Sequence, residues 1–132
     1  MADVRTDTTV RRTHPAHSAL VGLTSLGVLL QGLWAGLFLS GSDDPERWVT
    51  VHRHGAEVTV LLALLATVAA FVWLRHRVPV LVGTTLLLVL LVGEMMLGMG
   101  ADETRSLIAV HVPLALLIMG LAVWLPTQAR RG

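Results

Sequence analysis

Residues 28–32 read VLLQG and are followed, after a polar loop, by VTVH at residues 49–52. The same order returns later in the chain, as VLLVG at residues 89–93 and IAVH at residues 108–111. Each half is therefore an apolar segment, a loop and a second apolar segment with a histidine near its start. Such internal similarity is typical of a duplicated unit packed about an approximate two-fold axis. That axis would bring His52 and His111 face to face, a geometry that suits a metal ion or a haem iron.

The composition around these repeats indicates a membrane protein. Of the 132 residues, 54% are hydrophobic and only 14% are charged. A helix needs about 20 apolar residues to cross the hydrocarbon core of a bilayer, and helices satisfy their own backbone hydrogen bonds there. Four stretches meet this requirement, at residues 19–39, 49–74, 78–99 and 107–125. We therefore predict an all-α membrane protein, a bundle of four transmembrane helices made of two similar helix–loop–helix halves.

The predicted domain division follows from the same stretches. The four helices form one transmembrane domain over residues 17–126, followed by a tail at residues 127–132. Residues 1–16 are polar and rich in threonine, and we expect them to be disordered. The first apolar stretch is longer than the apolar region of a signal peptide and ends without a small-residue cleavage site, so it is interpreted as a helix.

The arginines predict the orientation of the bundle. Lysine is absent, which is typical of high-GC bacterial genes, and all ten cationic residues are arginines. One side carries Arg5, Arg11, Arg12, Arg75, Arg77, Arg130 and Arg131, whereas the other carries Arg47, Arg53 and Arg105 together with Asp43, Asp44, Glu46, Asp102 and Glu103. Because cytoplasmic loops of membrane proteins carry an excess of positive residues, the side with seven arginines is predicted to be cytoplasmic. We therefore expect a multi-pass protein of the inner (plasma) membrane with both termini in the cytoplasm.

Polar residues inside the predicted helices share one depth. They are Gln31, His52, Arg53, His54, Glu57, Glu94 and His111, and all fall in the outer half of the bundle. The inner half contains only Leu, Val, Ala, Thr, Gly and a few aromatic residues. Ionisable groups inside a membrane are costly and usually mark a functional site. For His14, His17 and His76, which lie at the ends or among arginines, we expect no specific role.

His52 is favoured over His54 as the inward-facing histidine. The two are about 200° apart around a helix with 3.6 residues per turn, so only one of them can face the centre. The small residues Gly55, Ala56, Thr59, Ala63 and Ala66 share the face of His52, and Ala115, Ile118 and Ala122 follow His111. Small residues leave room for a flat ring, although they equally permit close helix packing. For Gly32 and Gly36 on the first helix, we expect a role in close helix packing.

Glu94 is the polar group that most needs a partner. A carboxyl group inside an apolar helix must be protonated, paired or hydrated. Arg53, Arg105 and His54 are candidate partners, and a fourth alternative is that Glu94 orients a histidine through its ring N–H. Arg53 and Glu57, four residues apart, are a further candidate pair.

Two cofactors fit these residues. A pair of histidines between facing helices of a bundle is a common way to hold a b-type haem, with His52 and His111 as the iron ligands and Gln31, Arg53, His54 and Glu94 around them. Copper is the alternative, because the thioethers of Met95, Met96 and Met99 lie beside Glu94 and suit Cu(I). The absence of cysteine excludes disulfides, iron–sulfur clusters and thiolate-bound metals.

At these positions the chain resembles haem A synthases. Residues 51–56, VHRHGA, resemble the His-Arg-x-x-small pattern that opens a transmembrane helix in that family, and residues 110–114, VHVPL, resemble the histidine that opens a later helix. The resemblance implies a four-helix haem-binding unit with His52 and His111 as paired ligands. This chain has one such unit where the family has two. It also resembles small uncharacterised bacterial four-helix membrane proteins.

The sequence therefore predicts a cytochrome-b-like membrane protein for electron transfer or haem handling. With histidines on both faces of the iron, we expect no catalysis at the metal. The main alternative is an accessory or structural subunit without a cofactor, whose polar groups only determine helix register. A redox partner, a larger membrane complex and a homo-oligomer remain open as partners, and nothing indicates nucleic-acid binding.

Overall fold

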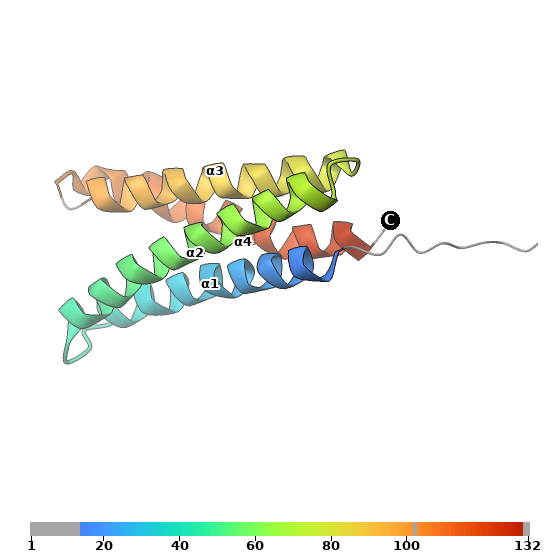
Figure 1. Cartoon of the computed structure of the whole chain (residues 1–132). Helices are drawn as coiled ribbons and strands as arrows, with labels where there is room; N and C mark the ends of the chain where they lie inside the picture. Colours follow the sequence, from blue (N-terminus) through green and yellow to red (C-terminus); the bar gives the residue numbers. More distant parts are fainter. Residues whose placement is uncertain (1–13, 102, 131–132) are drawn as a thin grey trace, which may run out of the picture.

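The protein is a bundle of four long helices. The computed structural model describes residues 14–101 and 103–130. In chain order the helices are α1 (Pro15–Leu39), α2 (Pro45–Trp73), α3 (Val78–Gly100) and α4 (Ile108–Arg130), with a short 3-10 helix η1 (Arg105–Leu107) before α4. The described residues include no strand. The predicted fold class is confirmed, because α1 with α2 and α3 with α4 form two consecutive helical hairpins (Figure 1).

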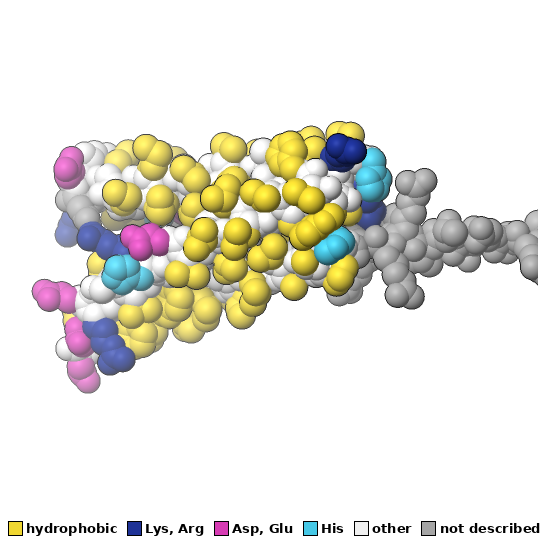
Figure 2. Space-filling view, viewed as in Figure 1, with side chains coloured by type: hydrophobic (Ala, Val, Ile, Leu, Met, Phe, Trp, Pro, Cys, Tyr) yellow, Lys and Arg dark blue, Asp and Glu magenta, His cyan; other side chains and the backbone are white. Residues whose placement is uncertain are grey.

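All four helices are long and apolar enough to cross a bilayer. The shortest of them, α3 and α4, have 23 residues each, which at 1.5 Å per residue exceeds the hydrocarbon core of about 30 Å. Their outward faces are covered by large apolar side chains, as Figure 2 shows for one face. Such a surface is stable against lipid tails and not against water, so the chain is a multi-pass membrane protein.

Proline and capping residues extend the helices beyond the apolar stretches. Pro15, Pro45 and Pro79 each occupy the first turn of a helix, where the missing N–H has no role. The side chain of Asp44 caps α2 by accepting a hydrogen bond of 3.0 Å from the backbone N–H of Arg47.

Two predicted boundaries differ as a result. Residues 15 and 16, assigned to the disordered segment, are helical, whereas the rest of that prediction falls mostly on residues 1–13, outside the described residues. Helix α4 continues to Arg130, five residues past the predicted end at Leu125, through Pro126. Hydropathy identifies only the apolar part of a helix, so it does not detect the polar turns at the helix ends.

The helices pack as a four-membered ring. Helix α1 contacts α2 and α4, and α3 contacts the same two helices. Helices α2 and α4, which carry the two repeated histidines, therefore lie diagonally across the bundle. The core between them consists of small and branched side chains, including Ala63, Ala66, Leu87, Ile118 and Ala122.

Packing is tight at one end of the bundle and loose at the other. We call the end with the connections 40–44 and 101–107 the outer end and the opposite end the inner end, after the predicted orientation. Within the described residues, no side chain is fully buried on the outer side of Val28, Thr59, Leu91 and Ile118. The two hairpins diverge toward that end (Figure 1). The outer end is therefore the part of the bundle that is not closed by its own core.

The prediction that Gly32 and Gly36 are packing glycines is wrong. A Cβ atom added at either position would meet no atom of the described residues within 4 Å. The close approaches occur at other glycines, such as Gly27, where a Cβ would lie 2.5 Å from the hydroxyl oxygen of Thr59. The spacing of glycines cannot show which face of a helix turns inward.

Candidate histidine site at the outer end

His52 lies on the inward side of α2, near its outer end. Its ring is half-buried, and Nδ1 lies 3.2 Å from the backbone carbonyl oxygen of Gln31 on α1. Phe38 stands edge-on to the ring, with centroids 5.6 Å apart. If Nδ1 carries the proton and donates to this carbonyl, Nε2 holds the lone pair. Helix α1 thereby orients the imidazole from one side.

His111 has a corresponding position on α4. Its Nδ1 lies 3.1 Å from Oε1 of Glu94 on α3, and both side chains are mostly buried, with 22% and 13% of their surface exposed. The two atoms are close enough for an ion pair, but their angle does not meet hydrogen-bond geometry. The ring packs over Gly98, where a Cβ would lie 3.1 Å from Cε1 of the imidazole. Glu94 therefore contacts a histidine and not the exposed His54, one of the alternatives that the sequence left open.

The two histidines form a matched arrangement. Each comes from the second helix of its hairpin and places Nδ1 against an oxygen of the first helix, Gln31 in one half and Glu94 in the other. The repeat in the sequence thus corresponds to a repeat in the way that the two imidazoles are held.

Several buried polar atoms around the histidines have no hydrogen-bond partner within the described part of the chain. They are both side-chain atoms of the Gln31 amide, both carboxyl oxygens of Glu94 and Nδ1 of His111. Leaving such groups without partners in an apolar setting costs about 1–3 kcal/mol each. The unpartnered polar atoms near the two histidines thus come from three helices, α1, α3 and α4.

Trp34 and Gly55 also belong to this site, although the sequence analysis did not select Trp34. The indole of Trp34 and the amide of Gln31 both pack directly against Gly55 of α2, where any Cβ would collide with them. Trp34 follows Gln31 by three residues, and Gly55 follows His52 by three, so each pair shares one helix face. That spacing was the signal available in the sequence.

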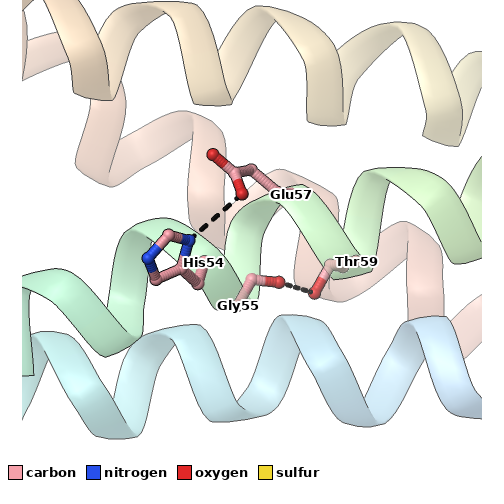
Figure 3. Close-up of polar contacts among 4 residues, drawn as sticks. All are labelled: His54, Gly55, Glu57 and Thr59. Atoms are coloured by element: carbon pink, nitrogen blue, oxygen red, sulfur yellow. Dashed lines mark hydrogen bonds and ion pairs between the residues drawn. The ribbon is translucent and has the colours of Figure 1, made fainter.

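His54, Arg53 and Glu57 lie on the exposed side of α2. The side chains of His54 and Glu57 are 72% and 65% exposed, and Nδ1 of His54 lies 3.2 Å from Oε2 of Glu57 (Figure 3). On the same helix the hydroxyl of Thr59 donates a 2.7 Å hydrogen bond to the carbonyl oxygen of Gly55 (Figure 3). Arg53 is exposed as well. The sequence grouped His54 and Arg53 with the cofactor site, and in the structure both side chains are exposed.

The donor set is small for a bare metal ion. The described residues contain no group of three or more His, Cys, Asp or Glu side chains that could hold one. Met96 and Met99 are 65% and 64% exposed on the outside of the bundle, so these two thioethers do not turn toward the histidines. A zinc or copper ion takes three or four protein ligands. Haem iron needs only two from the protein, because the porphyrin supplies the other four.

The expectation that His17 has no specific role is wrong in structural terms. His17 is only 2% exposed, and its Nε2 lies 3.2 Å from the hydroxyl oxygen of Thr84, which joins α1 to α3. His14 stacks on Trp73, with ring centroids 3.9 Å apart. The inner half therefore contains a buried imidazole, which the sequence missed because His17 precedes the apolar stretch of its helix.

In comparisons with known proteins, no protein-family model, no curated protein and no solved structure matches this chain, so its function has to be argued from the site itself.

Proposed function

We propose that this membrane protein binds a b-type haem between α2 and α4, that His52 and His111 would be the protein ligands of its iron, and that it acts in electron transfer or haem handling. The observation that carries the proposal is the matched arrangement of the two imidazoles. Each is partly buried and places Nδ1 against an oxygen of the other helix of its hairpin. This arrangement leaves Nε2 as the nitrogen that can bind iron.

The oxygens at Nδ1 prepare each ring for that role. An imidazole that donates its second N–H to a carbonyl or carboxyl group is held in one tautomer and orientation, and it becomes a stronger ligand. The Gln31 carbonyl does this for His52. Glu94 stands in the same relation to His111, and a small rotation of either side chain would align the 3.1 Å contact. The protein thus supplies both ligands and the groups that orient them.

The outer end of the bundle also has the right surroundings for a flat ring. No side chain is fully buried there within the described residues, and two residues that follow the histidines on their own helices, Ala56 and Ala115, are small. The unpartnered atoms of Gln31 and Glu94 provide polar contacts for the edge of such a ring. Haem, when bound, supplies reversible one-electron chemistry at its iron. If His52 and His111 both bound the iron, the chain would carry electrons and would not bind a substrate at the metal.

The arginine distribution supports a position in the plasma membrane with both termini in the cytoplasm. The histidine site would then lie toward the outer leaflet. A redox partner or a larger membrane complex would have to approach from that face, where the polar side chains of both hairpins gather (Figure 2).

The test is a reduced-minus-oxidised visible spectrum of the detergent-purified full chain, with haem supplied during expression. We expect the sharp α band of a low-spin haem, lost in His52→Ala and in His111→Ala separately. His54→Ala is the matched control, because it removes an exposed imidazole two residues from His52, and it should retain the band. A stable protein that stays colourless with added haem would contradict the proposal and favour the accessory subunit without a cofactor.

A further inference from the structure

A second candidate site lies at the opposite, inner end of the bundle. A pocket of about 310 Å³ opens there between the start of α3 and the end of α4. Its lining residues are His76, Arg77, Pro79, Val80 and Gln128. None of these residues belongs to the histidine site, so the pocket needs an explanation of its own.

The pocket lies at an end of the bundle where the described charged side chains are arginines, Arg75 and Arg77. Among the described residues, the side chains with ionisable groups at the inner end are all basic: His14, His17, Arg75, His76 and Arg77. All described acidic residues lie in the outer half of the bundle, from Asp43 to Glu57 and from Glu94 to Glu103. The face shown in Figure 2 has this asymmetry, with acidic side chains gathered at the outer end. Arg77 in the lining, with no described acidic residue at this end, therefore favours an anionic ligand.

Arg77 is positioned to contact such an anion. It precedes α3 and lines the pocket, while one of its terminal nitrogens lies 3.5 Å from the backbone carbonyl oxygen of Gln128 on α4. The guanidinium group thus reaches across the opening between the two helices. Its planar set of N–H donors matches the geometry of a phosphate group. The side chains of Gln128 and His76 add further polar contacts in the same pocket.

The surroundings of the pocket are those of the membrane interface. Trp73 and Trp124 at this end are each 44% exposed, as is typical of aromatic residues at the level of lipid headgroups. Directly beyond the pocket on α3, Val78 and Val82 are 61% and 57% exposed and form an apolar outer surface. A ligand seated here would meet basic side chains with its polar part and aliphatic side chains with its remainder.

We propose that this pocket binds the headgroup of an anionic phospholipid, with the phosphate at Arg77 and the acyl chains along the outer surface of α3. Basic pockets between transmembrane helices are known to select anionic headgroups. The site is independent of the histidine pair, and it would tie α3 to α4 at the inner end while the hairpins diverge at the outer end.

Native mass spectrometry of the detergent-purified full chain tests this. We expect adducts with dioleoyl-phosphatidylglycerol to be favoured over adducts with dioleoyl-phosphatidylcholine, which has the same acyl chains. Arg77→Gln should weaken phosphatidylglycerol binding by about tenfold or more, because it removes charge-assisted hydrogen bonds. Arg75→Gln is the matched control: it removes the same charge from an exposed residue outside the pocket, and the loss should not exceed about fivefold.

Three results would overturn the proposal: equal binding of the two lipids, equal losses in Arg77→Gln and Arg75→Gln, or displacement of phosphatidylglycerol by millimolar inorganic phosphate alone. The last result would identify a free anion as the ligand. If Arg77→Gln does not fold, Gln128→Leu replaces it, because this variant keeps every charge. It should still reduce the preference for phosphatidylglycerol, and an unchanged preference would equally count against the pocket.

Discussion

Replacement of Gly98 by valine should displace the ring of His111 and lower the free energy of unfolding. This cost should be present only when the imidazole of His111 is present. A Cβ at position 98 would lie 3.1 Å from Cε1 of His111, closer than an ordinary van der Waals contact, and the two methyl groups of valine extend beyond it. Overpacking of this kind typically costs about 1–3 kcal/mol. Gly93 on the same helix is the control, because a Cβ there would meet no described atom within 4 Å. Gly93→Val should change the free energy of unfolding by no more than about 0.5 kcal/mol.

A double-mutant cycle separates this collision from other effects of valine. In the His111→Ala background the colliding ring is absent, so Gly98→Val should cost no more than Gly93→Val. The difference between the two backgrounds, about 1–3 kcal/mol, is the interaction between the two side chains. The assay is reversible unfolding in mixed detergent and denaturing micelles, followed by circular dichroism. An equal cost of Gly98→Val in both backgrounds would refute the position of His111 over Gly98.

Two further predictions concern other parts of the bundle. Thr84→Val removes the hydroxyl next to the buried Nε2 of His17, and it should lower the free energy of unfolding by about 1–3 kcal/mol. Thr85→Val, on the same helix but less buried, is the control and should change the free energy of unfolding by no more than about 0.5 kcal/mol. Equal effects of the two variants in the same unfolding assay would contradict the His17 contact. The chain has no cysteine, so a single introduced cysteine reports on which side of the membrane its position lies. In intact cells a membrane-impermeant maleimide should label Asp43→Cys, whereas Thr127→Cys should react only after lysis. The reverse labelling pattern would contradict the proposed orientation.

Much of the site could be located from the sequence, because depth in a membrane helix follows directly from position in the chain. Gln31, His52, Glu94 and His111 were expected at one level, and the structure pairs His52 with the Gln31 carbonyl and His111 with Glu94. The partner of Glu94 stayed open at that stage, since Arg53, Arg105, His54 and a histidine ligand were all within reach. Only the packing of α3 on α4 places the carboxyl group beside His111.

The contacts of the glycines and of His17 could not be predicted from hydropathy and spacing. Hydropathy and spacing are properties of one helix, whereas a close approach is a property of two. Gly32 and Gly36 have the spacing of a packing motif and yet face no described neighbour, while Gly98 contacts His111. His17 precedes the apolar stretch, and from the sequence it was expected to be a terminal residue. In the structure α1 begins at Pro15, so His17 is part of the helix and its imidazole contacts Thr84.

By itself, the sequence determined the number of helices, their membrane character, the repeated histidines and the depth of the polar residues. These properties follow from local composition and from the fixed rise of a helix, which need no knowledge of neighbouring elements. The tertiary structure alone decided which residues meet: the Gln31 carbonyl with His52, Glu94 with His111 and Trp34 with Gly55. It also decided that the buried side chains of the described residues lie in the middle and inner part of the bundle, and that the hairpins diverge at the end that carries the histidines. Rotation of each helix about its axis and the divergence of the hairpins determine these contacts, and both depend on the packing of all four helices together.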